Sequence, residues 1–226
     1  MSSLITCSYK PNKYGNIPSL LQGYIHKVFQ RILTFFVKAP AKILDCTCGP
    51  KFFWRNWQNN KLDGKYEVVF SDVRKLGHVQ ADFFNLPFKD ECFDCVVFDP
   101  PYQDRWRFNL EKVKRPGRLY LENPYSLSEG CECFTPNQLD EVKAEFWRVL
   151  RPQGILIMKL ADHRTRNIWW QPEVFKRMTD LFKILDVIIY VRPKGSLFPP
   201  VYFIKRNNIS TLIHAYFFIL KKVIEI

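Results

Sequence analysis

The chain has 226 residues, of which 47% are hydrophobic and 25% charged, so it suits one packed globular domain and not a disordered segment. Its net charge of +12 favours a polyanionic partner such as nucleic acid, although a solvated basic face is the commoner reason for such an excess. No apolar run approaches the ~20 residues of a membrane span, so we expect no membrane partner.

Residues 1–40 hold five Lys and Arg and no Asp or Glu, a composition that organellar transit sequences share. Between residues 18 and 37, however, the apolar positions recur at helical spacing. These positions are Leu21, Ile25, Val28, Phe29, Ile32 and Phe36. We therefore interpret residues 1–40 as a loop followed by a packed amphipathic helix over 18–37, with the transit sequence as the alternative.

A strand, a glycine-bearing turn and a helix start follow one another between residues 42 and 59. Ile43 and Leu44 indicate a short strand, and the run Asp45-Cys-Thr-Cys-Gly-Pro50 leads into residues 51–59, which have helical character. Pro50 suits the first helical position, because its φ is fixed and its missing N–H would have no partner there. The backbone N–H groups of such a corner face a ligand, so we predict a nucleotide-binding loop.

A second acidic side chain follows the next predicted strand. Residues 66–70 are apolar enough to form a buried strand, and they close on Ser71 and Asp72. At this place an aspartate can accept hydrogen bonds from ribose hydroxyls, although a capping or loop aspartate is equally compatible with the pattern. A further short strand is predicted to end at Asp82.

The run from Phe93 to Phe98 has the apolar, β-branched character of a buried central strand. Pro100 and Pro101 cannot continue a sheet ladder, so they present Asp99 and Tyr102 in a stiff loop at the carboxyl end of that strand. The Asp99 carboxylate and the Pro100 carbonyl can accept the two N–H groups of an aromatic amine, and Tyr102 can stack on a base. A strand, a Pro-Pro turn and a surface tyrosine could also produce these residues by chance.

Residues 103–135 form a predicted insertion that is rich in basic and aromatic side chains. Its basic residues are Arg105, Arg107, Lys112, Lys114, Arg115 and Arg118. We predict a substrate-binding loop that contacts phosphates and unstacked bases, with an ordinary solvated loop as the alternative at even odds. Trp169 and Trp170 are a second place where bases could stack, but packed aromatic residues are commoner.

The remaining segments alternate between helical and strand patterns. Helices are predicted over 136–150 and 173–184, and strands over 155–160, 185–191 and 212–220. The last two strands are expected to pair antiparallel. Alternating strands and helices predict an α/β protein with a mostly parallel, doubly wound sheet.

The seven cysteines include three close pairs. The pairs are Cys46 with Cys48, Cys92 with Cys95, and Cys131 with Cys133. Two such pairs could form a tetrahedral zinc site, but two of the three have one intervening residue instead of the two to four that zinc sites usually show. We therefore predict no metal and interpret the cysteines as small buried side chains, reduced in a cytoplasm-like compartment.

The Asp45-Cys-Thr-Cys-Gly49 and Asp99-Pro-Pro-Tyr102 runs resemble the motifs of the class I S-adenosylmethionine-dependent amino-methyltransferases, which act on adenine N6 or cytosine N4 of DNA or RNA. The first motif of that family commonly reads Asp-Pro-Thr-Cys-Gly-Ser-Gly, so Lys51 stands in place of its second glycine. The resemblance covers about residues 42–220. It implies a Rossmann-like α/β fold with helices on both faces of the sheet and an antiparallel C-terminal hairpin.

The resemblance also implies S-adenosylmethionine as the cofactor and assigns the site. The cofactor-binding residues would be Asp45, Cys46, Thr47, Cys48, Gly49, Asp72, Asp82 and Phe83. The catalytic residues would be Asp99, Pro100, Pro101 and Tyr102. Asp82 would accept a hydrogen bond from the adenine of the cofactor and Phe83 would form an apolar wall. The acceptor amine would attack the methyl group directly, without a metal or a covalent enzyme intermediate.

The sequence thus predicts methylation of an exocyclic amino group of a nucleic-acid base. Adenine N6 of DNA is the first choice, because Asp99 replaces the serine common in cytosine enzymes. The alternatives are an amino group of an RNA base, guanine included, and a catalytically idle nucleic-acid-binding subunit, which Lys51 and Phe52 in the glycine loop favour. We expect one domain over residues 1–226, in the cytoplasm or another nucleic-acid-containing compartment, with loops or a partner subunit selecting the target.

Overall fold

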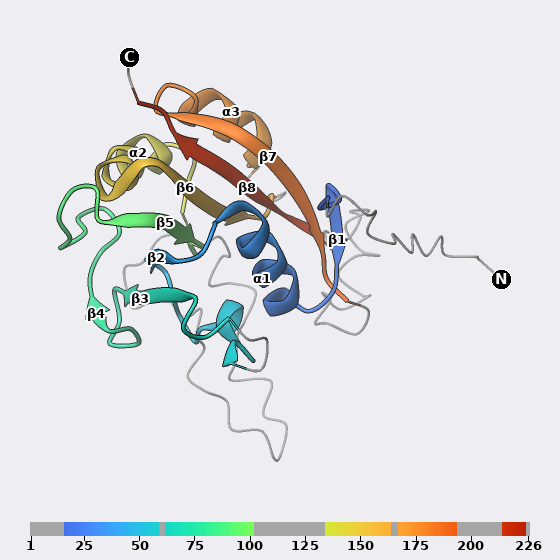
Figure 1. The fold of residues 1–226 in the computed structure, drawn as a ribbon. Helices are drawn as coiled ribbons and strands as arrows, with labels where there is room; N and C mark the ends of the chain where they lie inside the picture. Colours follow the sequence, from blue (N-terminus) through green and yellow to red (C-terminus); the bar gives the residue numbers. More distant parts are fainter. Residues whose placement is uncertain (1–15, 59–61, 102–133, 164–166, 194–213, 225–226) are drawn as a thin grey trace, which may run out of the picture.

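A computed structural model describes residues 16–58, 62–101, 134–163, 167–193 and 214–224, and in them the strands form one sheet (Figure 1). The strands are β1 (Leu20–Gln22), β2 (Ala41–Asp45), β3 (Tyr66–Asp72), β4 (Val79–Gln80), β5 (Phe93–Phe98), β6 (Leu150–Leu160), β7 (Phe182–Val191) and β8 (His214–Lys222). Their order across the sheet is β1-β7-β8-β6-β5-β2-β3-β4. All pairs are parallel except those of β8, which runs antiparallel to β6 and β7. The predicted fold class is confirmed.

The side chains of the central strand β5 are buried on both faces of the sheet. Successive side chains of a strand point to opposite faces, and from Cys95 to Phe98 every one is fully buried. Val96 and Phe98 belong to one apolar cluster, whereas Cys95 and Val97 belong to the other. Two cores therefore lie on the two faces of one sheet, as the continuous apolar run predicted.

The helices divide between these two cores (Figure 1). Helix α1 (Ile25–Phe36) and the 3₁₀ turn η1 (Phe52–Trp54) contribute to the cluster on one face. Helices α2 (Gln138–Val149) and α3 (Trp170–Met178) contribute to the cluster on the other. In the described part of the chain, no helix combines the length and the apolar composition that a membrane-spanning helix needs.

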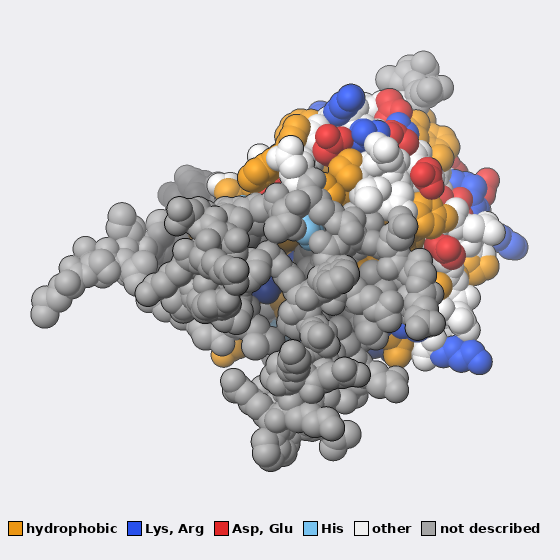
Figure 2. Space-filling model, turned by 180° about the vertical axis from the view of Figure 1, so that it is seen from behind, with side chains coloured by type: hydrophobic (Ala, Val, Ile, Leu, Met, Phe, Trp, Pro, Cys, Tyr) orange, Lys and Arg blue, Asp and Glu red, His pale blue; other side chains and the backbone are white. Residues whose placement is uncertain are grey.

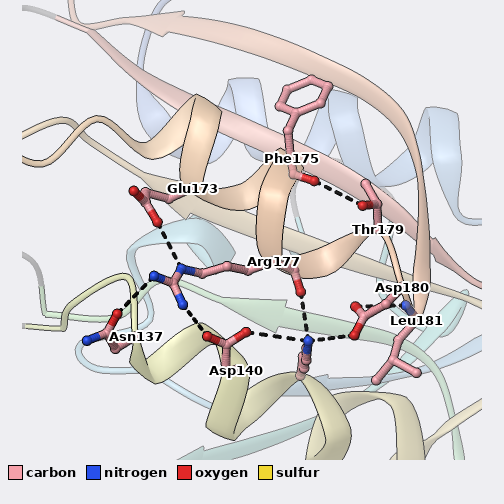
Figure 3. Close-up of polar contacts among 9 residues, drawn as sticks. Asn137, Asp140, Glu173, Phe175, Arg177, Thr179, Asp180 and Leu181 are labelled. Atoms are coloured by element: carbon pink, nitrogen blue, oxygen red, sulfur yellow. Dashed lines mark hydrogen bonds and ion pairs between the residues drawn. The ribbon is translucent and has the colours of Figure 1, made fainter.

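Polar contacts on the surface join α2 to α3 (Figure 3). Arg177 of α3 pairs with Glu173 on its own helix at 2.8 Å and with Asp140 of α2. Lys143 of α2 binds Asp180, which follows α3, at 2.6 Å. Asp140 and Asp180 are exposed, so each pair stabilises the fold by at most about 1 kcal/mol. The buried side chains beneath the network hold this layer more strongly.

The N-terminal helix is shorter than predicted. Helix α1 begins at Ile25, not at residue 18, and Leu20–Gln22 form strand β1 along β7. Leu21 is buried while its two neighbours are exposed, which is the alternation of an edge strand and not a helical pattern. Three residues are too few to show this period in a sequence that continues into a helix.

The segment after the glycine loop does not form the predicted helix over 51–59. In the described part of that segment, residues 51–58, η1 and Gln58 have 3₁₀ conformation and no α-helix is present. Pro50 lies in the preceding turn, so it does not occupy a first helical position. Burial of aromatic side chains outweighs helix formation, because Phe53 stacks on Phe29 of α1 at 4.5 Å between ring centroids. Gln30 of α1 also donates from its side chain to the carbonyl of Phe53 at 3.1 Å.

In the C-terminal half, the predicted elements are present with shifted ends. Strand β6 begins at Leu150, directly after α2, instead of at residue 155. Helix α3 and strand β7 begin earlier than predicted, and β7 extends back to Phe182 because that residue pairs with Lys222 of β8. Such ends depend on which strand lies alongside, and the local pattern does not contain that information.

Several predictions concern residues outside the described ranges. They include the catalytic Tyr102, the 103–135 insertion apart from its last two residues, and most of the basic segment from 192 to 206. The loop before residue 16 lies outside them as well. The prediction of a single domain stays a prediction.

Candidate active site

The carboxyl ends of β2, β3 and β5 bring three aspartates to one edge of the sheet. Asp45 and Asp72 are the last residues of their strands, and Asp99 directly follows β5. Because these strands are parallel and adjacent, their carboxyl ends meet at the same edge. The predicted cofactor loop and the predicted catalytic motif therefore lie side by side.

A hydrogen bond joins the two motifs directly. The backbone N–H of Asp99 donates to the Thr47 hydroxyl at 2.7 Å, across 52 positions of sequence. The Cys46 N–H also donates to the carbonyl of Val97 at 3.2 Å. Thr47 thus fixes the start of the Asp99 loop relative to the glycine loop, a role that the sequence did not reveal.

The glycine loop keeps its tight turn although a lysine replaces the second glycine. Gly49 has a φ of 46°, and Lys51 has a φ of 59° and a ψ of 39°, the left-handed conformation that glycine adopts most easily. For a lysine this conformation costs about 1 kcal/mol. The Lys51 ammonium lies 4.5 Å from the centre of the Phe70 ring, and this cation–π contact offsets part of the cost.

Asp45 is buried, and both of its carboxylate oxygens accept hydrogen bonds from the loop that follows. Oδ1 accepts from the Thr47 N–H at 3.2 Å, and Oδ2 accepts from Trp54 Nε1 at 2.7 Å. The pKa of Asp45 is raised to about 7. Burial is the largest cause and the neighbouring Asp99 and Asp72 act in the same direction, whereas the two hydrogen bonds oppose the shift. Asp45 therefore shapes the loop, and its predicted contact with a cofactor stays a prediction.

Asp72 is also buried, and it holds the glycine loop and a following arginine. Its Oδ2 accepts from the Gly49 N–H at 3.0 Å. Its Oδ1 accepts from the backbone N–H of Arg74 at 3.0 Å and from Arg74 Nε at 2.9 Å. A ribose bound at Asp72 would have to share this carboxylate with Arg74 or displace the guanidinium. Arg74 was not predicted from the sequence, although the Asp-x-Arg spacing of Asp72 and Arg74 could have indicated the pair.

Asp82 and Phe83 follow β4 in a turn beside Asp72. Asp82 is exposed, and its Oδ1 accepts the backbone N–H of Phe84 at 3.1 Å. Phe83 is half-buried and meets the Phe98 ring edge-on, with 5.1 Å between centroids. An accessible acceptor thus stands next to an apolar wall, as an adenine pocket requires.

The Asp99 carboxylate binds a lysine that the sequence analysis did not select. Lys159 Nζ lies 2.9 Å from Asp99 Oδ1; the Lys159 side chain is 8% exposed and that of Asp99 25%. Burial raises the pKa of Asp99, while Lys159 and, more weakly, Arg192 act in the opposite direction. The signal in the sequence was a single lysine within the apolar run of residues 155–160.

The Asp99 loop is anchored on its far side by a buried aromatic group. Pro100 is buried, and the carbonyl of Pro101 accepts the Phe134 N–H at 2.8 Å. The Phe134 ring stacks on Trp170, with 5.7 Å between centroids. Trp170 is therefore a core residue and does not stack on bases, whereas Trp169 is 45% exposed.

The described cysteines are free thiols, and most are buried. Cys46, Cys48 and Cys95 are buried and Cys92 is partly exposed. Burial raises the pKa of Cys48 to about 12, so this thiol stays protonated at neutral pH. Among the residues that the structure describes, no group of three or more His, Cys, Asp or Glu side chains is placed to hold a metal.

No protein-family model matches the chain, and no curated protein matches it in sequence. Solved structures match it in fold. The N-methyltransferase NodS from Bradyrhizobium japonicum, in complex with S-adenosyl-L-homocysteine, is 13% identical over 87% of this chain and 85% of its own, with a TM-score of 0.51. The 1,6-didemethyltoxoflavin-N1-methyltransferase from Burkholderia thailandensis is 12% identical over 88% and 79%, with a TM-score of 0.53.

The chain has the fold of S-adenosylmethionine-dependent methyltransferases. The same fold also supports other chemistry, because the 4+2 cyclase SpnF is 12% identical over 87% of this chain and 80% of its own, with a TM-score of 0.51. Identities this low establish the fold alone, so the reaction depends on the residues of the site.

The methyltransferase fold places a switch in strand order at the candidate site. From β2 the chain proceeds outward to β3 and β4, and then returns to β5 on the other side of β2. In open α/β sheets, ligands bind at the carboxyl edge where the order reverses. In this sheet the order reverses between β2 and β5, where Thr47 of the glycine loop contacts the backbone of Asp99.

Proposed function

We propose that the protein is a methyltransferase that uses S-adenosylmethionine to methylate an exocyclic amino group of a nucleic-acid base, with adenine N6 of DNA as the first choice. The observation that carries this proposal is the contact between the two motifs. Thr47 of the glycine loop binds the backbone of Asp99 at the strand-order switch. A methyl donor in the loop and an amine at Asp99 would therefore be neighbours.

The described residues fit the cofactor. The glycine loop has the tight turn that allows close approach to a ligand, with Gly49 at positive φ. Asp82 and Phe83 provide an exposed acceptor and an apolar wall for an adenine. At Asp72 a ribose hydroxyl would compete with Arg74 for the carboxylate.

When bound, the cofactor supplies a methyl group that its sulfonium makes electrophilic. The residues of the chain then orient the acceptor. Asp99 Oδ2 and the Pro100 carbonyl would each accept one N–H of the amine, so that its lone pair points to the methyl carbon. As the acceptor nitrogen bonds to the methyl carbon, the C–S bond would break with its electron pair left on the sulfur, and the proton released by the nitrogen would pass to solvent. Tyr102 would stack on a base turned out of its helix.

Cofactor binding tests the first half of the proposal. Calorimetric titration of the purified chain with S-adenosylmethionine should show micromolar binding, and Asp82→Ala should weaken it about tenfold through loss of one hydrogen bond. Asp63→Ala is the matched control, because Asp63 is exposed and precedes the amino end of β3, whereas Asp72 of the candidate site lies at the carboxyl end of that strand. Equal effects of the two substitutions would contradict the assigned adenine pocket.

Transfer of labelled methyl groups to separate DNA and RNA pools tests the second half. Nucleoside analysis should find the label in N6-methyladenine of DNA, and Asp99→Ala should abolish transfer. Label found only in RNA would select the RNA alternative. If the wild-type chain labels neither pool while a control enzyme labels both, the proposed reaction is wrong.

Binding to the nucleic acid should depend mainly on phosphate contacts. Where side chains are coloured in Figure 2, acidic and basic groups are interspersed and do not gather in one basic patch. We assign the phosphate contacts to the basic residues of the predicted 103–135 insertion and of the 192–206 segment, as the sequence indicates. A quadruple variant should test this by removing the charges of Arg105, Arg107, Lys114 and Arg115. The slope of log affinity against log salt should fall by about one per lost contact, and an unchanged slope would place the nucleic acid elsewhere.

The competing function is a nucleic-acid-binding subunit without catalysis, which Lys51 in the glycine loop favours. The left-handed conformation of Lys51 argues against it, because the loop retains a shape suited to close backbone approach. The cofactor titration decides between them. Absence of binding up to millimolar cofactor would favour the idle subunit.

A further inference from the structure

Lys159 occupies a buried position, where a lysine destabilises the fold unless its charge is paired. It lies near the carboxyl end of β6, between Met158 and Leu160, both of which are fully buried, and is itself 6% exposed. An ammonium group taken out of water must be paired or hydrogen-bonded, because desolvation of a lone charge is unfavourable by several kcal/mol. Its ion-pair partner at this position is Asp99.

The sheet register explains why these two residues meet. Strands β5 and β6 are parallel neighbours, and Phe98 pairs with Met158. Asp99 directly follows Phe98, and Lys159 directly follows Met158, so the two residues lie at the same level of the sheet edge. The pair is therefore part of the edge that carries the predicted catalytic motif.

The two oxygens of the Asp99 carboxylate have different surroundings. Oδ1 accepts from Lys159 Nζ at 2.9 Å. Within the described ranges, no donor binds Oδ2, and the Asp99 side chain keeps 25% of its surface exposed. One oxygen is thus turned inward to a cation, and the other is left for a ligand.

We propose that Lys159 is a positioning residue that holds the Asp99 carboxylate ionised and directs its Oδ2 to an N–H of the acceptor amine. The inference rests on the proposed function, since it names how that site is prepared. An ionised Asp99 accepts the amine N–H at Oδ2, whereas a carboxyl group protonated on Oδ2 would present a donor to another donor. The Lys159 charge keeps Asp99 in the accepting form.

The other charged groups around Asp99 show why a cation is needed there. Asp45, at the end of β2, adds a second carboxylate nearby, and its pKa is raised in part by Asp99. Arg192, which follows β7, contributes a weaker favourable charge. Burial itself raises the pKa of Asp99. Lys159 is the cation bound to the carboxylate, so it opposes the effect of burial on the pKa of Asp99.

Direct titration of Asp99 tests the pairing without any need for activity. In protein labelled with ¹³C at the aspartate carboxyl carbons, the Asp99 signal can be assigned by its loss in Asp99→Asn. Lys159→Met should raise the pKa of Asp99 by about 1 to 2 units, as expected for the loss of an opposite charge at this distance. Lys159→Arg should keep the wild-type value. Equal pKa values in wild type and Lys159→Met would overturn the proposal.

Turnover measured against pH tests the catalytic consequence. The acidic limb of the profile should move to higher pH in Lys159→Met by the same amount as the pKa of Asp99, and Lys159→Arg should restore it. A structural role alone would lower turnover at every pH without moving the limb, and that result would also overturn the proposal. If Lys159→Met does not fold, Lys159→Gln keeps a hydrogen-bond donor without the charge and should show the same displacement.

The two measurements separate this inference from the proposed function. A raised Asp99 pKa in Lys159→Met, together with no methyl transfer by wild type to either nucleic acid, would refute the proposed substrate and support the pairing. Methyl transfer by wild type with an unmoved acidic limb would support the proposed function and refute the role of Lys159.

Discussion

Replacement of Asp45 by asparagine should remove a large part of the pH dependence of stability. Asp45 is buried at the end of β2, and its pKa is raised from an ordinary value of 3.8 to about 7. A carboxyl group whose pKa is raised by folding favours the folded state only while it is protonated. Stability is therefore lost as the pH rises from about 4 to 7, and it is constant above that range.

The size of the effect follows from the pKa values. A rise from 3.8 to about 7 corresponds to about 4 kcal/mol, at about 1.4 kcal/mol per unit. About three-quarters of this falls between pH 4.5 and pH 8.5. The amide oxygen introduced by Asp45→Asn can still accept from Trp54 Nε1, and the lost bond to the Thr47 N–H is a constant offset. The free energy of unfolding of Asp45→Asn, relative to wild type, should therefore rise by about 3 kcal/mol across that interval.

Denaturant unfolding of both proteins, at several pH values between 4.5 and 8.5, measures this difference. Burial also raises the pKa of Asp99, which lowers stability over a similar interval, but Asp99 is present in both proteins and largely cancels. The slope with denaturant should stay the same, so that midpoints can be compared. A difference between the two proteins that does not change with pH would show that Asp45 is not perturbed and would refute the reasoning.

Three further substitutions test the loops around the site. Thr47→Val removes the acceptor of the Asp99 N–H, so it should lower the free energy of unfolding by about 1 to 2 kcal/mol and strongly reduce turnover. Thr47→Ser should preserve both stability and turnover. Lys51→Ala loses the contact with Phe70 but keeps the left-handed backbone, so by denaturant unfolding Lys51→Gly should be more stable than Lys51→Ala by up to about 1 kcal/mol. A Cβ on Gly77 would lie 2.3 Å from the Phe70 carbonyl oxygen, so Gly77→Ala should lower the denaturation midpoint by the equivalent of about 2 kcal/mol or more; a neutral effect would contradict this packing.

The sequence was sufficient for the parts of the fold that rest on local patterns. The apolar run of β5 and the two prolines after it predicted a buried strand that stops before Asp99, and β5 is buried and ends at Phe98. The alternation of strands and helices predicted the parallel sheet and its antiparallel C-terminal pair. These features depend on side-chain periodicity and backbone restriction, which neighbouring residues contain.

Local patterns failed where tertiary burial outweighed them. The aromatic run of η1 was predicted to be helical, but its rings pack on α1 and Trp54 reaches back to Asp45. Strand β1 was hidden because three residues are too few to show a period, and its pairing with β7 depends on a strand more than 160 positions away.

The candidate site likewise combines features that the sequence predicted with features that it did not. The residues at the carboxyl ends of the strands could be predicted from the sequence, because the motifs Asp45–Gly49 and Asp99–Tyr102 directly follow apolar runs. The partners of those carboxylates depend on the arrangement of the strands in the sheet. Lys159 pairs with Asp99 across 60 positions, because two parallel strands happen to be neighbours in register. Charges buried at one edge of a sheet must find partners there, and strand order selects those partners.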